Sequence, residues 1–444
     1  MDVRRLRTYD AVALTALLWF LGKFVRYAFP PLFGPLQAGY DVSNAAVGTA
    51  FTGFMLVYAL MQFPSGAIAD RVGPVRVIGL GAGVAGVGSL ALAVDAPFVA
   101  LAGIMLVIGA GTGAHKTVAV RLLARTYPDR TGRVLGVHDT LGALGGVAAP
   151  AAVVLVLTPP PVLAALLGPL PGADWRGLFV ATGITALAAA AVFAARVPAR
   201  LSARSEATDA DADGDTDPGV DAYLAAFRDP RLVAFVFVTV AFSFAYNGAV
   251  AFFPLYLSAV AGLSTSTASL IYAALFAATF VQLVSGDLSD RLGRLPVMAV
   301  TLAFASVALV IVVALGADGP ALTGGYAPVV LGSLVVAFGL GSHGFRPVRG
   351  AFLVETLPDR LAGGGLGAVR TLLMGAGAFA PAVVGAIADR AGFRPAFAGL
   401  AGSLPLAPLV PASLWATRSV RRRRGRIGPA SPPRGAPPLR APRP

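Results

Sequence analysis

Long apolar stretches recur along the whole chain and constrain its fold more than any other feature. A helix needs about 20 apolar residues to cross the hydrocarbon core of a bilayer. Stretches of that kind occupy 11–33, 46–64, 75–94, 97–124, 134–157, 177–195, 232–257, 264–285, 295–316, 327–355, 363–387 and 393–416. They predict an all-α integral membrane protein with twelve transmembrane helices.

The composition excludes several other classes of protein. Hydrophobic residues make up 56% of the chain and charged residues 13%, which is outside the range of soluble globular domains. The absence of cysteine excludes disulfides and thiolate metal sites, and with only three histidines we expect no metal site and no cofactor. The basic start is followed by a long apolar stretch without a small-residue cleavage site. We interpret that stretch as the first transmembrane helix and not as a removed signal peptide.

The placement of charge predicts the orientation in the membrane. The net charge of +13 could indicate nucleic-acid binding, but the arginines lie mainly at alternate ends of the apolar stretches and in the run Arg421–Arg426. The loops on the other side carry chiefly aspartates, at Asp41, Asp95, Asp174 and Asp318. By the positive-inside rule both termini are cytoplasmic. We therefore expect a multi-pass protein of the cytoplasmic membrane with no nucleic-acid partner.

The two halves of the chain are related to each other. The run Gly109–Arg130 aligns with Gly339–Arg360 at an offset of 230, and Gln62–Gly73 aligns with Gln282–Gly293 at an offset of 220. Two related groups of six helices are typical of secondary transporters. The predicted organisation is a six-helix bundle at 1–195, a flexible acidic cytoplasmic linker at 196–230, a second bundle at 231–416 and a basic disordered cytoplasmic tail at 417–444.

The duplicated loop motif resembles a known family. The pattern G-x-x-x-D-R-x-G between the second and third stretches, repeated between the eighth and ninth, resembles the signature loop of the major facilitator superfamily, and the resemblance covers residues 10–417. It implies two pseudo-symmetric six-helix bundles around a central cavity, with alternating access by rocking of one bundle against the other. It also implies a gating role for the motif residues, which here are Gly66, Asp70, Arg71, Gly73, Asp290 and Arg291.

Charged and polar residues inside the predicted helices are candidates for a substrate site. An ionised side chain at the bilayer centre costs about 2.5–3.5 kcal/mol on insertion scales, so such residues mark function by default. The predicted substrate-binding residues are Lys23, Arg26, Tyr27, His115, Lys116, Asn247, His343 and Arg346. A second group, at His138, Asp139 and Arg370, is either a coupling site or a structural charge cluster.

The excess of cations in this group predicts the charge of the substrate. Lys116 and Arg346 occupy matching positions in the repeated runs, and Asp139 is the clear carboxylate nearby. A positive cavity with apolar walls favours an anion, and arginine binds carboxylate or phosphate through two parallel hydrogen bonds. The predicted function is alternating-access transport of a small organic or inorganic anion. Coupling is by proton symport or antiport, with His115, His343 or Asp139 as the proton carrier, or by exchange.

Two other functions stay open at this point. Gly142, Gly145, Gly146 and Pro150 partly resemble a glycine motif of drug antiporters in the family, which favours efflux of lipophilic compounds. A non-transporting membrane sensor is the alternative from another class, although the duplicated gating loops argue against it. No nucleophile constellation or pair of catalytic carboxylates is found, so an enzyme is not expected. The expected partners are the anionic solute and anionic lipid headgroups at the basic tail, and the expected state is a monomer.

Overall fold

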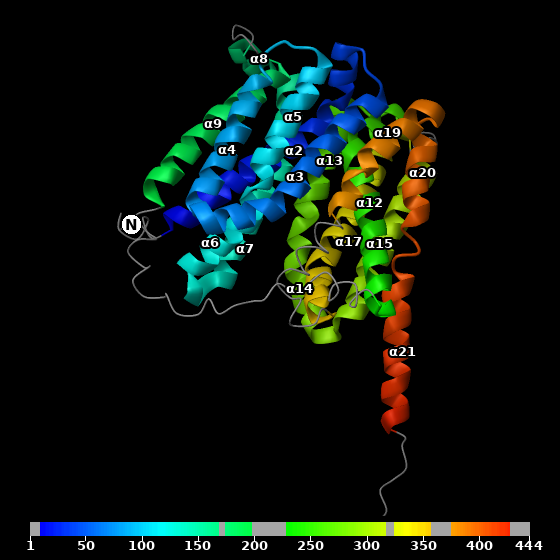
Figure 1. Cartoon of the computed structure of the whole chain (residues 1–444). Coiled ribbons are helices and arrows are strands. Elements are labelled where there is room, and N and C mark those ends of the chain that lie inside the picture. Colours follow the sequence, from blue (N-terminus) through cyan, green and yellow to red (C-terminus); the bar gives the residue numbers. More distant parts are fainter. Residues whose placement is uncertain (1–8, 168–173, 198–227, 317–323, 357–373, 427–444) are drawn as a thin grey trace, which may run out of the picture.

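The structure is a computed structural model that describes residues 9–167, 174–197, 228–316, 324–356 and 374–426 (Figure 1). Helices account for nearly all of these residues, and no strand occurs among them. Ten described segments are long and apolar enough to cross a membrane, and they coincide with the first ten predicted stretches. The prediction of an all-helical membrane protein is confirmed.

The helices of the first half lie together on one side of the molecule, and those of the second half lie on the other (Figure 1). The first half consists of α2 (Asp10–Tyr40), α3 (Asn44–Val72), α4 (Pro74–Ala91), α5 (Phe98–Gly113), α6 (His115–Thr126), α7 (Thr131–Leu157), α8 (Pro161–Leu167) and α9 (Trp175–Arg196). The second half consists of α12 (Pro230–Ala259), α13 (Thr265–Ala277), α14 (Val281–Leu292), α15 (Arg294–Leu315), α17 (Ala327–Thr356), α19 (Ala380–Ala391), α20 (Phe393–Ser403) and α21 (Leu409–Arg426).

Several predicted helices are interrupted in the structure, and the stretch 264–285 is one of them, with the 3-10 turn Ala278–Phe280 between α13 and α14. The stretch 97–124 breaks at Ala114, directly after the glycine-rich end of α5. Glycine weakens a helix because it has no side chain to limit its backbone freedom. The stretch 393–416 divides into α20 and α21 around Pro405 and Pro408, which lack the backbone N–H that a continuous helix needs. Helix α21 continues through Arg426, beyond the predicted end of this stretch, and residues 363–373 of the eleventh stretch lie outside the described ranges.

The glycines of the repeated runs allow neighbouring helices to touch through their backbones. A Cβ atom added to Gly111 of α5 would lie 2.5 Å from the carbonyl oxygen of Gly81 in α4. A Cβ atom added to Gly341 of α17 would lie 2.5 Å from the backbone nitrogen of Ala305 in α15. Any larger residue would separate these helices, so the glycines of both runs have the same packing role.

The glycines that close the two signature motifs make tight turns between helices. Gly73 has a φ of 91° and Gly293 a φ of 93°, a region that favours glycine, and each glycine lies between the last residue of one helix and the first of the next. We call the end of the molecule that holds these turns the basic end. The opposite end holds Asp41, Asp174 and the third such turn, at Gly392 with a φ of 88°.

At the opposite end the two halves are joined by α3 and α19, which pack side by side. The Asp389 carboxylate of α19 accepts hydrogen bonds from the backbone N–H groups of Asn44 (2.9 Å) and Ala45 (2.8 Å), at the start of α3. The Asn44 side-chain amide donates a third bond, of 2.8 Å. Unpaired N–H groups and the positive end of the helix dipole make a helix start a favourable place for a carboxylate. Asp389 therefore caps a helix that belongs to the other half of the chain.

Backbone contact reinforces this cap. A Cβ atom on Gly48 would clash with the carbonyl oxygen of Pro381, and one on Gly385 would clash with the carbonyl oxygen of Asn44. One turn further along, the backbone N–H of Ala382 donates to Thr52 Oγ1 at 3.0 Å. The close approach of α3 and α19 seals the two halves together at the opposite end.

Replacing Asp389 with asparagine tests the cap. We expect Asp389→Asn to weaken the contact between the halves and lengthen the distance between spin labels at Val94→Cys and Thr265→Cys, two exposed positions at the opposite end. The chain has no cysteine of its own, so these labels are specific. Arg390→Gln, at the exposed neighbouring position, is the matched control and should leave the distance unchanged. Equal distances in all three proteins would show that Asp389 does not hold the halves together.

The same contact gives an expected pH dependence. Burial alone raises the pKa of the Asp389 carboxyl, but hydrogen bonds from the Ala45 backbone and from Ser43 and Asn44 outweigh it and hold this pKa below its ordinary value. A lowered pKa in the closed state means that the cap stabilises closure above the ordinary carboxyl pKa of about 3.9 and is lost as the pH falls below it. The label distance should therefore lengthen on acidification in the wild type and change less in Asp389→Asn.

Candidate functional site

Two arginines from opposite halves lie against tyrosine rings between the halves. Arg26 of α2 is 8% exposed, and its guanidinium carbon lies 3.6 Å from the centroid of the Tyr58 ring of α3. Arg346 of α17 is half-buried, and its guanidinium carbon lies 4.5 Å from the centroid of the Tyr246 ring of α12. The ring faces attract the cations, and a stacked guanidinium keeps its in-plane N–H groups available for a ligand.

Lys23 links the cations of the two halves. It is on α2, one turn before Arg26, and its ammonium lies within electrostatic range of Arg26, Arg346 and Lys116. Its Nζ atom lies 5.1 Å from the centroid of the Trp19 ring. Cations from α2, α6 and α17 therefore gather in one region, as the sequence predicts for Lys23, Arg26, Lys116 and Arg346.

Lys116 differs from the other three cations because it has a carboxylate partner. Its ammonium forms an ion pair with Asp139 of α7 and lies 5.2 Å from the centroid of the Trp19 ring. The Lys116 side chain is 14% exposed and that of Asp139 is 57% exposed. Among the described residues, Lys23, Arg26 and Arg346 have no ion pair within 4 Å. The uncompensated charge of the site therefore rests on these three residues.

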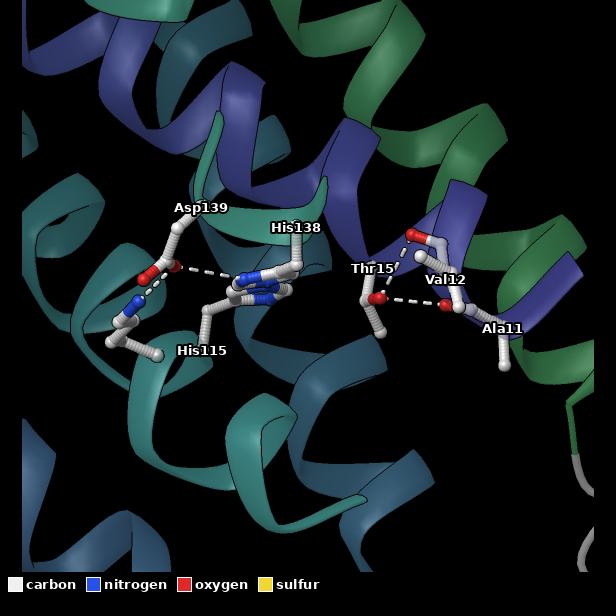
Figure 2. A network of polar contacts seen from close by, with 7 residues as sticks. Ala11, Val12, Thr15, His115, His138 and Asp139 are labelled. Atoms are coloured by element: carbon white, nitrogen blue, oxygen red, sulfur yellow. Dashed lines mark hydrogen bonds and ion pairs between the residues drawn. The ribbon is translucent and has the colours of Figure 1, made fainter. Parts of the chain in front are cut away.

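The ion pair continues into a buried pair of histidines (Figure 2). His138 Nδ1 lies 3.1 Å from Asp139 Oδ1, and the Nε2 atoms of His138 and His115 lie 3.4 Å apart. If His138 is neutral and donates to the carboxylate through Nδ1, its Nε2 is an acceptor and His115 Nε2 is the donor. The structure thus groups His115 and Lys116, two of the predicted substrate-binding residues, with His138 and Asp139.

Trp19 holds this cluster against α2. Its ring stacks on His115 at a centroid distance of 5.8 Å and on His138 at 6.1 Å, while Lys23 and Lys116 both lie close to it. The sequence analysis did not select Trp19. The available signal was its position four residues before Lys23, which places the two side chains on one face of a helix.

Several neutral polar groups near the arginines lack hydrogen-bond partners in the described part of the chain. His343 of α17 is 1% exposed, and neither ring nitrogen has a partner. The buried hydroxyls of Tyr246 and Tyr272 also lack one, as does the Nε atom of Arg26. Buried polar groups without partners are rare in folded proteins, because each gives up its hydrogen bonds to water. These groups point to a ligand that supplies the missing bonds.

Tyr27, Asn247 and Arg370 are the remaining predicted site residues, and they do not share one location. Tyr27 packs on Phe276 of α13, with ring centroids 4.2 Å apart, so it joins the two halves. The Asn247 side-chain amide donates to the carbonyl oxygen of Ser243 at 2.8 Å, one turn back on its own helix. Arg370 lies outside the described residues. Tyr27 therefore lies at the boundary between the halves. The side-chain amide of Asn247 is already hydrogen-bonded within α12.

The signature loop of the first half is engaged within its own half. The Asp70 carboxylate accepts two hydrogen bonds from Arg121 of α6, at 2.7 and 3.3 Å. Arg121 is not among the predicted site residues, and the partner helix of Asp70 cannot be read from the loop motif. In the second half Arg291 pairs with Asp287 at 2.9 Å, and Asp290 is exposed.

The family model of the Major Facilitator Superfamily matches residues 15–338, well over half of the chain. The chain belongs to the major facilitator superfamily. It is a multi-pass membrane transporter and not an enzyme, as the sequence predicts. No curated protein sequence matches it.

Solved structures of this superfamily share the fold of the chain. A bacterial homologue of the human lysosomal transporter Spinster, in an inward-facing and unoccupied conformation, aligns with a TM-score of 0.69 and 16% identity, covering 91% of this chain and 96% of that one. The nucleoside transporter NupG aligns with a TM-score of 0.69 and 14% identity, covering 92% and 99%. The peptide transporter POT in complex with sulfate aligns with a TM-score of 0.68 and 16% identity, covering 94% and 98%. Likeness at these identities shows the fold alone.

The ion pair between Lys116 and Asp139 can be tested by a double-mutant cycle. Because Lys116 is mostly buried, we expect Asp139→Asn to destabilise the protein more in the wild type than in a Lys116→Gln background. Solvent screening at Asp139 limits the coupling free energy to about 1 kcal/mol. The measurement is unfolding of the purified protein in detergent.

The exposed pair of Asp70 and Arg121, with side chains 53% and 45% exposed, is the matched control. Its coupling free energy should be smaller, because both partners are well hydrated in the unpaired state. A coupling between Lys116 and Asp139 no larger than that of the control would mean that the pair adds nothing to stability.

Proposed function

We propose that the chain carries a small organic or inorganic anion, of the carboxylate or phosphate type, across the cytoplasmic membrane by alternating access. The observation that carries this proposal is the group of Lys23, Arg26 and Arg346, which have no carboxylate partner in the described part of the chain. A fixed positive charge in a poorly hydrated region is favourable only with a counter-ion. The substrate is that counter-ion.

The arrangement of the halves supports alternating access around this group. The opposite end is sealed by the contact of α3 with α19 and by that of α7 with α13. In the proposed orientation the basic end and both termini are cytoplasmic, so this conformation admits the substrate from the cytoplasmic side. The two bundles, at 1–195 and 231–416, then rock about the site.

The proposed coupling site is the cluster around Asp139. Asp139 is the carboxylate partner of Lys116 and the hydrogen-bond partner of His138, so a proton arriving there changes the charge beside Lys23 and the substrate. Proton coupling requires this cluster, whereas exchange of one anion for another does not. Lipid headgroups are the proposed partners of the basic residues at the end of α21.

Transport by proteoliposomes tests the proposed function. Arg346→Gln and Lys23→Gln should each lower the uptake of the preferred anion roughly 10- to 100-fold, because a hydrogen bond to a charged group contributes about 1.5–3 kcal/mol. The panel consists of carboxylates, phosphates and lipophilic cations.

Arg349→Gln is the control for charge and for helix α17. Arg349 lies three residues beyond Arg346, with its guanidinium carbon 5.9 Å from the centroid of the Phe345 ring. Its substitution should leave anion uptake close to that of the wild type. Transport of lipophilic cations that is equal in the wild type and in Arg346→Gln would replace the proposal with the efflux alternative.

A further inference from the structure

Arg26 of the first half and Arg346 of the second half both lie within electrostatic range of the Tyr246 hydroxyl, and together with the neutral donors around them they specify the substrate more closely. We propose that the substrate is a divalent anion that bridges Arg26 and Arg346 and accepts further hydrogen bonds from Tyr272, Tyr246 and His343. This inference rests on the proposed function and specifies the charge of its substrate.

The charge of the ligand follows from which cations are already stabilised. Lys116 has Asp139 as its partner, and Lys23 lies over Trp19 and within electrostatic range of the same carboxylate. Arg26 and Arg346 interact with tyrosine rings, which attract a cation but carry no net negative charge. The two guanidiniums therefore have no carboxylate partner in the described part of the chain, and a divalent anion can pair with both of them. A monovalent anion would leave one of them without a counter-ion.

The neutral donors specify where the ligand carries acceptors. The hydroxyl of Tyr272, which is 0% exposed, lies within electrostatic range of Arg26, and the Tyr246 hydroxyl within range of both arginines. The Tyr272 hydroxyl has no hydrogen-bond partner among the described residues. The Tyr246 hydroxyl lies beside Arg346, which can only donate to its oxygen, so its O–H remains available; the His343 ring, 6.0 Å from that of Tyr246, lies beside the Leu275 carbonyl and leaves at least one nitrogen available. Hydroxyl and imidazole N–H groups donate to the oxygens of an anion. A ligand with several exposed oxygens satisfies both the arginines and these donors.

Two chemical groups meet this description, a phosphate monoester and a dicarboxylate. Each can be compared with its methyl ester, which carries one charge fewer and one methyl group more. Methyl phosphate pairs with dimethyl phosphate, and succinate pairs with monomethyl succinate. At pH 8 the phosphate monoester is doubly ionised, because its second pKa is near 6. Comparison within each pair isolates the charge of the ligand, and comparison between pairs identifies its chemical group.

The experiment measures the thermal stability of the full-length protein in detergent against these four probes, at constant ionic strength. We expect the divalent member of one pair to stabilise the wild type at a concentration about tenfold or more below that of its monovalent partner. Arg346→Gln should abolish this preference. Tyr272→Phe keeps the ring and removes only the hydroxyl, so it should raise the half-maximal concentration of the divalent probe about tenfold without loss of fold. Arg349→Gln should behave as the wild type.

The possible outcomes separate this inference from the proposed function. If the monovalent and divalent probes stabilise the wild type equally and Arg346→Gln responds to neither, the anion site stands and its divalent character is wrong. A response of equal size in the wild type and in Arg346→Gln would be a general salt effect and would overturn the inference. Stabilisation by tetraphenylphosphonium and by none of the four anions would overturn both proposals.

Discussion

The free-energy cost of removing cations from water determines which interactions are needed at the centre of this transporter. A buried charge is tolerated only where other groups replace its hydration. The charge of Lys116 is compensated by its ion pair with Asp139, whereas the charges of Arg26 and Arg346 are compensated only in part, by contact with tyrosine rings. This difference in compensation is the basis for proposing that Lys116 has a structural role and that Arg26 and Arg346 bind an anion. Because Arg26 belongs to the first half and Arg346 to the second, an anion that completes their compensation also connects the halves.

At the opposite end the halves are also connected by charge compensation, but there both partners belong to the protein. Asp389 provides a carboxylate to the unpaired N–H groups at the start of α3, across the boundary between the halves. Its sequence context, Gly385–Gly392, repeats the G-x-x-x-D-R-x-G pattern of Gly66–Gly73. The two copies have different partners, since Asp70 binds Arg121 within its own half. One short pattern thus provides an acidic side chain next to a tight turn, and the helix that happens to face it decides whether it joins the halves.

The sequence predicts the parts of this molecule that depend on local composition. Apolar length predicts the first ten spans, and internal repetition predicts the equivalence of Gly111 and Gly341, which have the same packing role. Partners on different helices depend on how each helix is rotated and how deep it lies, which hydropathy does not reveal. For this reason Arg121, Trp19 and Asp389 are not among the predicted residues, and the sequence does not reveal that His115 stacks on His138.

Charge also constrains how the proposed transport cycle is coupled. In the proposed cycle, closure of the basic end would bring α17, with Arg346, closer to the cations of α2 and α6. Coulomb repulsion rises as the distance falls, and it is strong where the effective dielectric constant is low. Without an anion, the approach of Arg346 to Lys23 and Arg26 is unfavourable, so the empty carrier stays open at that end. A divalent anion between the arginines reverses the sign of this interaction and favours closure. A carrier of this kind returns only with an anion bound, which is the condition for exchange. Net uptake would additionally require a change of charge within the site, which is the role proposed for the Lys116–Asp139 pair.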